Sequence, residues 1–189
     1  MNSLRKDNNE IKRDLLQQWV PRGSKVLDVG CGQGGDVHKW KHISVRLTGI
    51  DPNPMAIQEA IRRSRGFGTF MNGYIYDAPL EQYDIVCYNF SLQYQPVEYI
   101  EEIKKRLRPG GLLIGVVTDP DRIHLAQEYG IHIERIPGKD SISVYIPGTP
   151  YYAHGSIDEP LFQKDVYIDQ FTPLVWEPFS IYAKFVFTY

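Results

Sequence analysis

The segment Gly30-Cys31-Gly32-Gln33-Gly34-Gly35 constrains the fold of this chain more than any other. It follows Lys25 to Val29, a short apolar run typical of a buried strand, and a helix is expected to start near Gly35. Open α/β sheets bind nucleotides at such a glycine-rich turn between a strand and a helix. The sequence therefore predicts a strand-loop-helix binding site in the first part of the chain.

Strands and helices are expected to alternate around this segment. Apolar spacing predicts a helix over Ser3 to Trp19, and Asn53 followed by Pro54 is typical of a helix start. The strands are mostly apolar on both faces, as in a parallel sheet covered by helices. Further strands are expected at 45–50, 70–74, 83–88 and 112–117. One helix is expected to end before Gly66, and another to cover 96–107. After this second helix, Pro109-Gly110-Gly111 is expected to make a turn.

The pattern changes after about residue 130. Alternating apolar and polar residues over Ile131 to Tyr152 indicate short antiparallel strands or a loop excursion, and 180–189 is expected to be a final strand. We therefore expect one domain, made of an N-terminal helix (1–20), a cofactor-binding core (21–129) and a substrate-pocket excursion with C-terminal strands (130–189).

The composition is that of a globular domain. The chain has 189 residues, with 21 Lys and Arg against 23 Asp and Glu, which excludes a strongly basic nucleic-acid tail and a polyacidic disordered chain. Only Cys31 and Cys87 are present, too few for a disulfide framework or a zinc site, so a reducing compartment is expected. No apolar run reaches the ~18 to 20 residues that span a bilayer, and the N-terminus lacks the apolar core of a signal peptide. A soluble, intracellular protein is expected.

Two carboxylates indicate which cofactor the glycine segment suits. Gly30, Gly32 and Gly35 satisfy GxGxxG, a pattern shared by two cofactor classes. Asp28 and Asp36 would place two negative charges beside the pyrophosphate of a dinucleotide. The ammonium group of S-adenosylmethionine can instead pair with Asp28. The sequence predicts S-adenosylmethionine as the cofactor, with no metal.

Two further carboxylates follow the next strands. Asp51, at the end of the second strand, is placed to accept hydrogen bonds from the ribose hydroxyls. Asp77, just past the third strand, is placed for the adenine amino group, although turn chemistry accounts for it equally well.

Several segments resemble the mRNA cap guanine-N7 methyltransferases. They are Asn8 to Lys12, the loop from Val26 to Asp36 with Lys39-Trp40, Asn89 to Tyr94, and Leu107 to Gly111. The narrower resemblance is to the C-terminal methyltransferase domain of large DNA virus capping enzymes of the African swine fever virus type. It implies a Rossmann-like class I S-adenosylmethionine-dependent methyltransferase, an α/β fold with a mostly parallel seven-stranded sheet, helices on both faces and an antiparallel C-terminal strand.

The resemblance also implies roles for single residues. The cofactor-binding residues are then Asn8, Lys12, Asp28, Gly30, Asp36, Asp51, Asp77 and Ser91. The cap-binding residues are Phe90, Gln93, Tyr94, Arg63, Glu159 and Tyr182. Composition alone would make Asn8 and Lys12 solvated helix residues, and Phe90 and Tyr94 ordinary packing.

The chain departs from the family pattern in the predicted cap pocket. Gln33 stands where lysine is usual, Gln93 replaces a histidine, and Thr118 replaces a proline. The glutamate that reads the guanine edge aligns loosely with Glu159. Two nearby carboxylates remain alternatives, Asp158 and Asp165.

The implied reaction is methyl transfer from S-adenosylmethionine to N7 of the mRNA cap guanine by in-line displacement. N7 attacks with a lone pair that carries no proton, so orientation suffices and no catalytic general base is expected. The expected partners are capped RNA with a GpppN 5′ end and upstream triphosphatase and guanylyltransferase domains of the same viral polypeptide, without a membrane. The expected location is the cytoplasm, at a viral replication site or in the virion.

Other functions stay open at this point. A methyltransferase for another base or a small molecule would keep Asp28 and Asp51 but use 90–94 for packing. A non-catalytic domain that binds capped RNA or a partner would explain the departures as a decayed site. An NAD-dependent oxidoreductase would share the glycine pattern.

Overall fold

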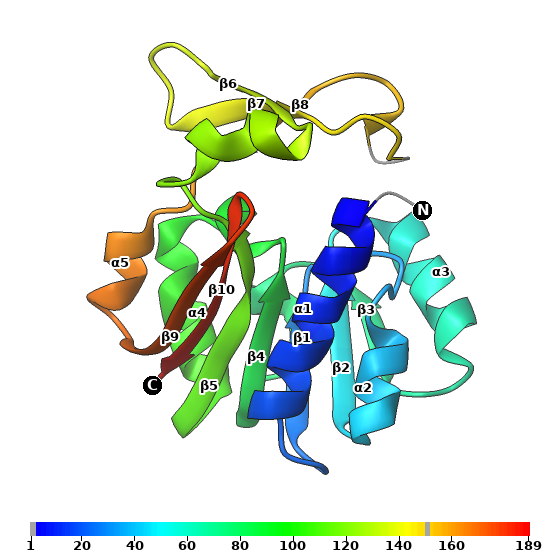
Figure 1. Cartoon of the computed structure of the whole chain (residues 1–189). Coiled ribbons are helices and arrows are strands. Elements are labelled where there is room, and N and C mark those ends of the chain that lie inside the picture. The colour runs from blue at the N-terminus through cyan, green and yellow to red at the C-terminus, as the bar shows by residue number, and fades with distance from the viewer. Residues whose placement is uncertain (1–2, 150–151) are drawn as a thin grey trace.

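The computed structural model, which describes residues 3–149 and 152–189, has a seven-stranded sheet at its centre (Figure 1). The strand order is β3-β2-β1-β4-β5-β10-β9. The strands are β1 (Lys25–Val29), β2 (Arg46–Asp51), β3 (Thr69–Asn72), β4 (Tyr83–Asn89), β5 (Leu107–Thr118), β9 (Thr172–Phe179) and β10 (Tyr182–Thr188). Strands β1 to β5 are parallel, and β10 is antiparallel to β5 and β9. The expected mostly parallel sheet with an antiparallel C-terminal strand is confirmed.

Helices cover both faces of this sheet. The helices are α1 (Ser3–Trp19), α2 (Val37–Ile43), α3 (Pro54–Ser64), α4 (Ile100–Arg106) and α5 (Lys164–Ile168). Shorter 3-10 turns are η1 (Ile75–Asp77), η2 (Leu92–Tyr94), η3 (Val97–Tyr99) and η4 (Ile123–Tyr129). Helices α1 and α2 lie on one face and α4 lies behind the sheet in the view of Figure 1.

The strand sequence explains why both faces are covered. Neighbouring side chains of a strand point to opposite faces, and Val26 and Leu27 of β1 are both fully buried. Val26 belongs to the same apolar cluster as Leu16 of α1 and Trp40 of α2. Leu27 belongs to the opposite cluster with Ile103 of α4. A strand that is apolar on both sides is stable only between two helical layers.

Most element boundaries follow local sequence signals. The Asn53 side chain accepts hydrogen bonds from the backbone of Met55 (3.0 Å) and Ala56 (3.2 Å), which confirms the expected start of α3. The expected helix over 96–107 is divided into η3 and α4. The expected turn at 109–111 is wrong, because these residues continue β5. The C-terminal Tyr189 bonds with the backbone of Gly110 (2.6 Å) and Gly111 (3.1 Å), which holds this stretch in the sheet as an irregular part of β5, where Gly110 has φ +71°.

A second, smaller sheet stands beyond the carboxyl ends of the parallel strands (Figure 1). It consists of β6 (His132–Arg135), β7 (Ser141–Tyr145) and β8 (Ile157–Pro160) in antiparallel order. Of the two expectations for 131–152, antiparallel strands are confirmed. Ile142 and Val144 join the same apolar cluster as Tyr182 of β10, so this sheet is packed onto the core.

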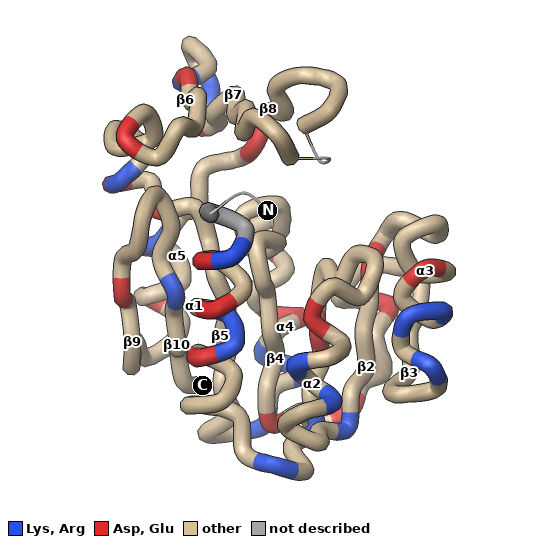
Figure 2. The backbone as a smooth tube through the Cα atoms, turned by 45° about the vertical axis from the view of Figure 1, so that its right-hand side comes forward, with Lys and Arg blue, Asp and Glu red and all other residues tan. Residues whose placement is uncertain are grey.

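The strand order reverses between β1 and β4, and the chain leaves these two strands in opposite directions across the sheet. Such a switch point opens a crevice at the carboxyl ends of the strands, where α/β sheets bind ligands. Basic and acidic segments alternate along α1 (Figure 2), whereas α2 contains lysines but no acidic residue. No helix within residues 3–149 and 152–189 is long and apolar enough to cross a membrane.

Candidate active site

The glycine loop lies at this switch point, between β1 and α2. Gly30, Gly32 and Gly34 have φ angles of +72°, +52° and +72°, a region that side chains other than glycine rarely adopt. The third required glycine is therefore Gly34, whereas the GxGxxG spacing had suggested Gly35. A Cβ at Gly30 would lie 2.4 Å from Cβ of Ser91, whereas nothing lies within 4 Å of one at Gly32. The loop is thus closed toward β4 at Gly30 and open at Gly32.

Asp28 is a buried carboxylate at the base of the loop. Its Oδ2 accepts a hydrogen bond from the indole Nε1 of Trp40 at 2.9 Å. Burial, followed by the nearby charge of Asp36, raises the pKa of Asp28 to about 7. A cation placed beside it would favour the ionised form. No role was predicted for Trp40, although the Lys39-Trp40 pair is part of the motif that resembles the family and could have indicated one.

Asp36 has a different environment from Asp28. Lys12 Nζ lies 2.9 Å and Lys39 Nζ 2.5 Å from its Oδ1, and Asn89 donates to its Oδ2 at 3.1 Å. Burial would raise the pKa of Asp36, but the two lysines together outweigh it and lower that pKa. Asp36 therefore does not present the free negative charge that was expected beside the glycine loop, because Lys12 and Lys39 neutralise it. Among the described residues, Asp28 alone of this pair lacks a cationic partner.

Two amide oxygens near these charges have no partner. Oδ1 of Asn8 and Oδ1 of Asn89 are buried and accept no hydrogen bond from the described residues. Buried acceptors without donors are costly, and a ligand with N–H groups would relieve them. Together with the ionisable Asp28, they suit the ammonium end of S-adenosylmethionine. The donor and acceptor set therefore fits the predicted cofactor.

Asp51 lies at the end of β2, beside the loop. Its Oδ2 accepts the N–H of Gly32 and its Oδ1 the N–H of Asn53, both at 2.9 Å. A carboxylate oxygen has two acceptor sites, so each oxygen can still accept a ribose hydroxyl. Asp51 thus lies at the carboxyl end of β2 and contacts the glycine loop through Gly32.

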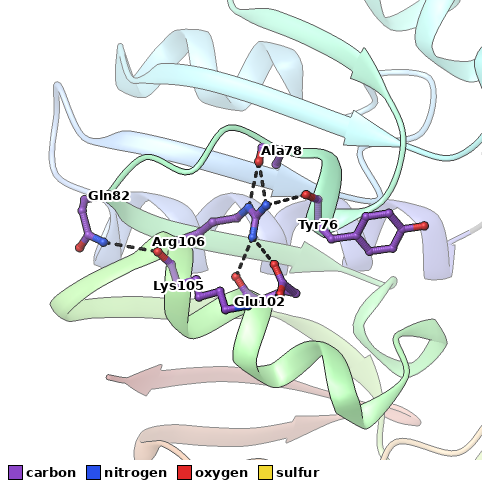
Figure 3. A network of polar contacts seen from close by, with 6 residues as sticks. All are labelled: Tyr76, Ala78, Gln82, Glu102, Lys105 and Arg106. Atoms are coloured by element: carbon purple, nitrogen blue, oxygen red, sulfur yellow. Dashed lines mark hydrogen bonds and ion pairs between the residues drawn. The ribbon is translucent and has the colours of Figure 1, made fainter.

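Asp77 lies in η1, and its Oδ2 accepts the N–H of Tyr74 at 2.9 Å, which is the turn chemistry that the sequence left as an alternative. The turn is held from below by Arg106, which is 1% exposed (Figure 3). Arg106 donates to the carbonyls of Tyr76 (2.7 Å) and Ala78 (2.8 and 3.1 Å) and pairs with Glu102 (2.6 Å). This guanidinium therefore clamps the backbone on both sides of Asp77.

Phe90 and Ser91 follow β4 at the other side of the switch point. Phe90 has φ +63°, and its ring lies edge-on to Tyr182, with centroids 5.0 Å apart. Lys12 Nζ lies 5.8 Å from the Phe90 ring centroid. The Ser91 hydroxyl donates to the carbonyl of Val29 at 2.7 Å. Phe90 thus borders the Lys12–Asp36 pair, and Ser91 joins β4 to the glycine loop.

Glu159 on β8 is buried beside these aromatic residues. Its Oε1 accepts a hydrogen bond from Tyr152 at 2.9 Å. Burial raises the pKa of Glu159, while hydrogen bonds from Tyr152, Tyr94 and Gln93 act in the opposite direction. Burial, and next the charge of Glu159, raise the pKa of Tyr182, while a hydrogen bond from Asn8 lowers it. Three of the predicted cap residues, Gln93, Tyr94 and Tyr182, therefore lie around the carboxylate of Glu159.

The alternatives for this carboxylate lie elsewhere. Asp158 and Asp165 are both exposed, whereas Glu159 is 6% exposed. The structure thus brings Glu159 to Gln93, Tyr94 and Tyr182. It does not bring Arg63 there, because Arg63 lies on α3, where it pairs with Glu59 (2.6 Å) and donates to Gln33 (3.4 Å).

A continuous series of contacts joins the two halves of the site. Asp36 pairs with Lys12, and Lys12 lies over the ring of Phe90. Phe90 contacts Tyr182, whose pKa is raised by burial and then by the charge of Glu159. The glycine loop and the aromatic pocket are therefore adjacent. A glycine loop at the switch point, carboxylates at the carboxyl ends of β1 and β2, and the antiparallel β10 are arranged as in the Rossmann-like fold of S-adenosylmethionine-dependent methyltransferases.

Comparison with known proteins agrees with this fold. The family described as a methyltransferase domain matches residues 27–113. A solved structure of a Pyrococcus horikoshii protein superposes with a TM-score of 0.75 at 16% identity, covering 95% of this chain and 90% of that one. A glycopeptide N-methyltransferase complexed with S-adenosyl-L-homocysteine superposes with a TM-score of 0.68 at 12% identity, covering 93% and 87%.

Curated proteins of similar sequence include mRNA cap guanine-N(7) methyltransferases. The mRNA cap guanine-N(7) methyltransferase of Cryptococcus neoformans is 34% identical over 144 residues, which cover 62% of this chain and 23% of the relative. That of Schizosaccharomyces pombe is 28% identical over 171 residues, 78% of this chain and 48% of the relative. The chain thus spans less than half the length of these relatives.

Proposed function

We propose that this protein transfers a methyl group from S-adenosylmethionine to N7 of the guanine cap of mRNA. The relatives named as cap guanine-N(7) methyltransferases support the substrate. The structures of methyltransferases complexed with S-adenosylmethionine or S-adenosyl-L-homocysteine support the cofactor.

One observation carries the proposal, the position of Glu159. This carboxylate is buried among Tyr152, Tyr94 and Gln93, and it is close enough to raise the pKa of Tyr182. Guanine presents N–H donors on the edge opposite N7, and methylation makes it cationic. A buried carboxylate bordered by aromatic rings suits both properties.

When bound, S-adenosylmethionine supplies the activated methyl group. Asp28, with the free oxygens of Asn8 and Asn89, holds a donor-rich group at one end of the site. Asp51 presents its remaining acceptor sites to hydroxyl groups. Glu159 and the aromatic residues orient the guanine. Because N7 attacks with a lone pair that carries no proton, no residue has to act as a general base in this in-line displacement.

We also infer that the domain works within a multifunctional viral capping enzyme in the cytoplasm, beside triphosphatase and guanylyltransferase domains. The motif resemblance to large DNA virus capping enzymes supports this context. The test is to purify the native polypeptide from its source, determine its extent by mass spectrometry and assay it for triphosphatase and guanylyltransferase activity. A native polypeptide without these activities would contradict this context but leave the methyltransferase proposal intact.

Paired RNA substrates test the methyltransferase proposal directly. The protein is incubated with labelled S-adenosylmethionine and either GpppG-capped RNA or the same RNA already methylated at N7. We expect label in the first RNA only, and nuclease digestion should release 7-methylguanosine caps. Equal labelling of both RNAs, or of neither, would contradict the assignment.

A further inference from the structure

A groove between α1 and α2 lies outside the site described so far. It encloses about 230 Å³ and is lined by Arg13, Gln17, His38, Lys39, His42 and Ile43. Arg13 and Gln17 are four residues apart on α1, and His38 and His42 are four apart on α2, so each pair forms one row on its helix. The two rows thus line the groove from its two helices with side chains that can donate hydrogen bonds, and none of the lining residues is Asp or Glu.

The donors of this groove are available to a ligand. Arg13, Gln17 and His42 are exposed, and none of them forms a hydrogen bond or ion pair with the described residues. Two arginines of α3 differ in this respect, because Arg62 and Arg63 both pair with Glu59. The Arg13 guanidinium can therefore pair with an external anion.

Two cationic side chains line the groove, those of Arg13 and Lys39. The pKa of His38 is lowered by burial and then by the charges of Lys39 and Arg13, which together act against the attraction of Asp36. Lys39 forms the buried wall, and its own pKa is lowered first by burial and further by Lys12 and Arg13. Arg13 is therefore the unpaired positive charge among these lining residues, because the charge of Lys39 is paired with that of Asp36.

The groove shares helix α1 with the proposed cap pocket. Asn8 of α1 bonds to Tyr182 at the pocket, and Gln17 lies nine residues further along the same helix. At 1.5 Å per residue this is about 14 Å, within reach of the first few nucleotides after a cap. Lys39 also contacts Asp36, so the groove adjoins the glycine loop directly.

We propose that the α1–α2 groove binds the phosphate backbone of the RNA that follows the cap. The inference rests on the proposed function for the identity of the ligand. Arg13 supplies a forked donor for phosphate oxygens, and Gln17 and His42 supply further hydrogen-bond donors on either side. Contacts of this kind carry no base specificity, so the groove recognises the polyanion and not its sequence.

The test compares a short and a long substrate with one double variant, Arg13→Gln with His42→Gln. We expect the KM for a capped RNA of about 20 nucleotides to rise three- to tenfold, while the KM for the GpppG dinucleotide changes less than twofold. The slope of log K against log salt for RNA binding should fall by about one for the lost arginine. Lys105→Gln is the matched control, because Lys105 is an exposed residue of α4, on the opposite face of the sheet, and the substitution also removes one positive charge.

Binding of a fluorescent uncapped RNA of the same length separates this inference from the proposed function. If wild-type protein methylates no cap, the proposed function fails, but the salt-dependent RNA affinity still reports on the groove. Wild-type RNA affinity and salt slope in the double variant would overturn the groove assignment. An equal loss in Lys105→Gln would also overturn it, since net charge alone would then explain the effect.

Discussion

The indole N–H of Trp40 donates a hydrogen bond to Oδ2 of Asp28 at 2.9 Å, joining α2 to β1 beneath the glycine loop. Both side chains are buried, so water cannot replace this bond. We expect Trp40→Phe, which keeps an aromatic ring, to lower the free energy of unfolding by about 1 to 3 kcal/mol. Urea unfolding measures this cost, and calorimetry should show weaker binding of S-adenosyl-L-homocysteine. Trp19→Phe is the control, because no described residue accepts a hydrogen bond from the Trp19 indole; equal losses in both variants would contradict the assigned role.

The raised pKa of Asp28 predicts a pH dependence of stability. An ordinary value near 3.8 in the unfolded chain and about 7 in the folded protein mean that the native state holds an extra proton between these values. The contribution of Asp28 is therefore fully present below about pH 4 and is lost as pH rises through 7, with a total of about 4 kcal/mol. Asp28→Asn should remove this dependence, making the variant more stable than wild type at pH 8 yet unable to bind the cofactor. Parallel pH profiles of the two proteins in chemical unfolding would disprove the assignment.

The contact between Gly30 and Ser91 predicts a non-additive pair of substitutions. Gly30→Ala combines a positive φ with a Cβ only 2.4 Å from Cβ of Ser91, so we expect a loss of about 2 to 5 kcal/mol in unfolding free energy. Gly32→Ala has the φ strain alone and should cost about 1 to 2 kcal/mol. Adding Ser91→Gly to Gly30→Ala should recover part of the difference in a double-mutant cycle. Strict additivity would show that the two residues do not press on each other.

Arg106 predicts a link between core stability and adenine recognition. Arg106→Lys keeps the charge but loses the fork that holds Tyr76 and Ala78 (Figure 3). Because it leaves buried carbonyls unpaired, we expect a loss of about 2 to 4 kcal/mol in unfolding free energy. If the clamp also positions Asp77 for adenine, preference for S-adenosyl-L-homocysteine over its inosine analogue, which lacks the adenine amino group, should fall several-fold. An unchanged preference in a folded variant would restrict Arg106 to a structural role.

Glu159 predicts a loss of activity without a loss of cofactor binding. Glu159→Gln keeps the size of the side chain but removes the charge that favours a cationic product, so we expect methylation of capped RNA to fall more than tenfold. The affinity for S-adenosyl-L-homocysteine should stay within twofold of wild type. Asp158→Asn removes a charge from the exposed neighbouring position and should have wild-type activity. If the two variants were equally active, Glu159 would not be the residue that binds guanine.

Local sequence signals account for much of the fold. Asn53 and Pro54 start a helix because the capping bonds involve the next three residues only. The apolar strands and the glycine loop likewise depend on neighbours in the chain, and each is found, although β5 begins earlier than expected and the third glycine is Gly34. The stretch 109–111 was predicted as a turn, whereas it belongs to β5, because its hydrogen-bond partner is the distant C-terminal residue Tyr189.

The chemistry of the site depended on contacts between distant residues. By itself the sequence determined that a glycine loop with Asp28 and Asp51 follows parallel strands, since spacing along the chain defines these positions. Only the tertiary structure showed that Lys12 neutralises Asp36 and that Glu159 is the carboxylate enclosed by the aromatic pocket. The reason is physical: burial and charge pairing are set by residues dozens of positions away, which no local pattern specifies.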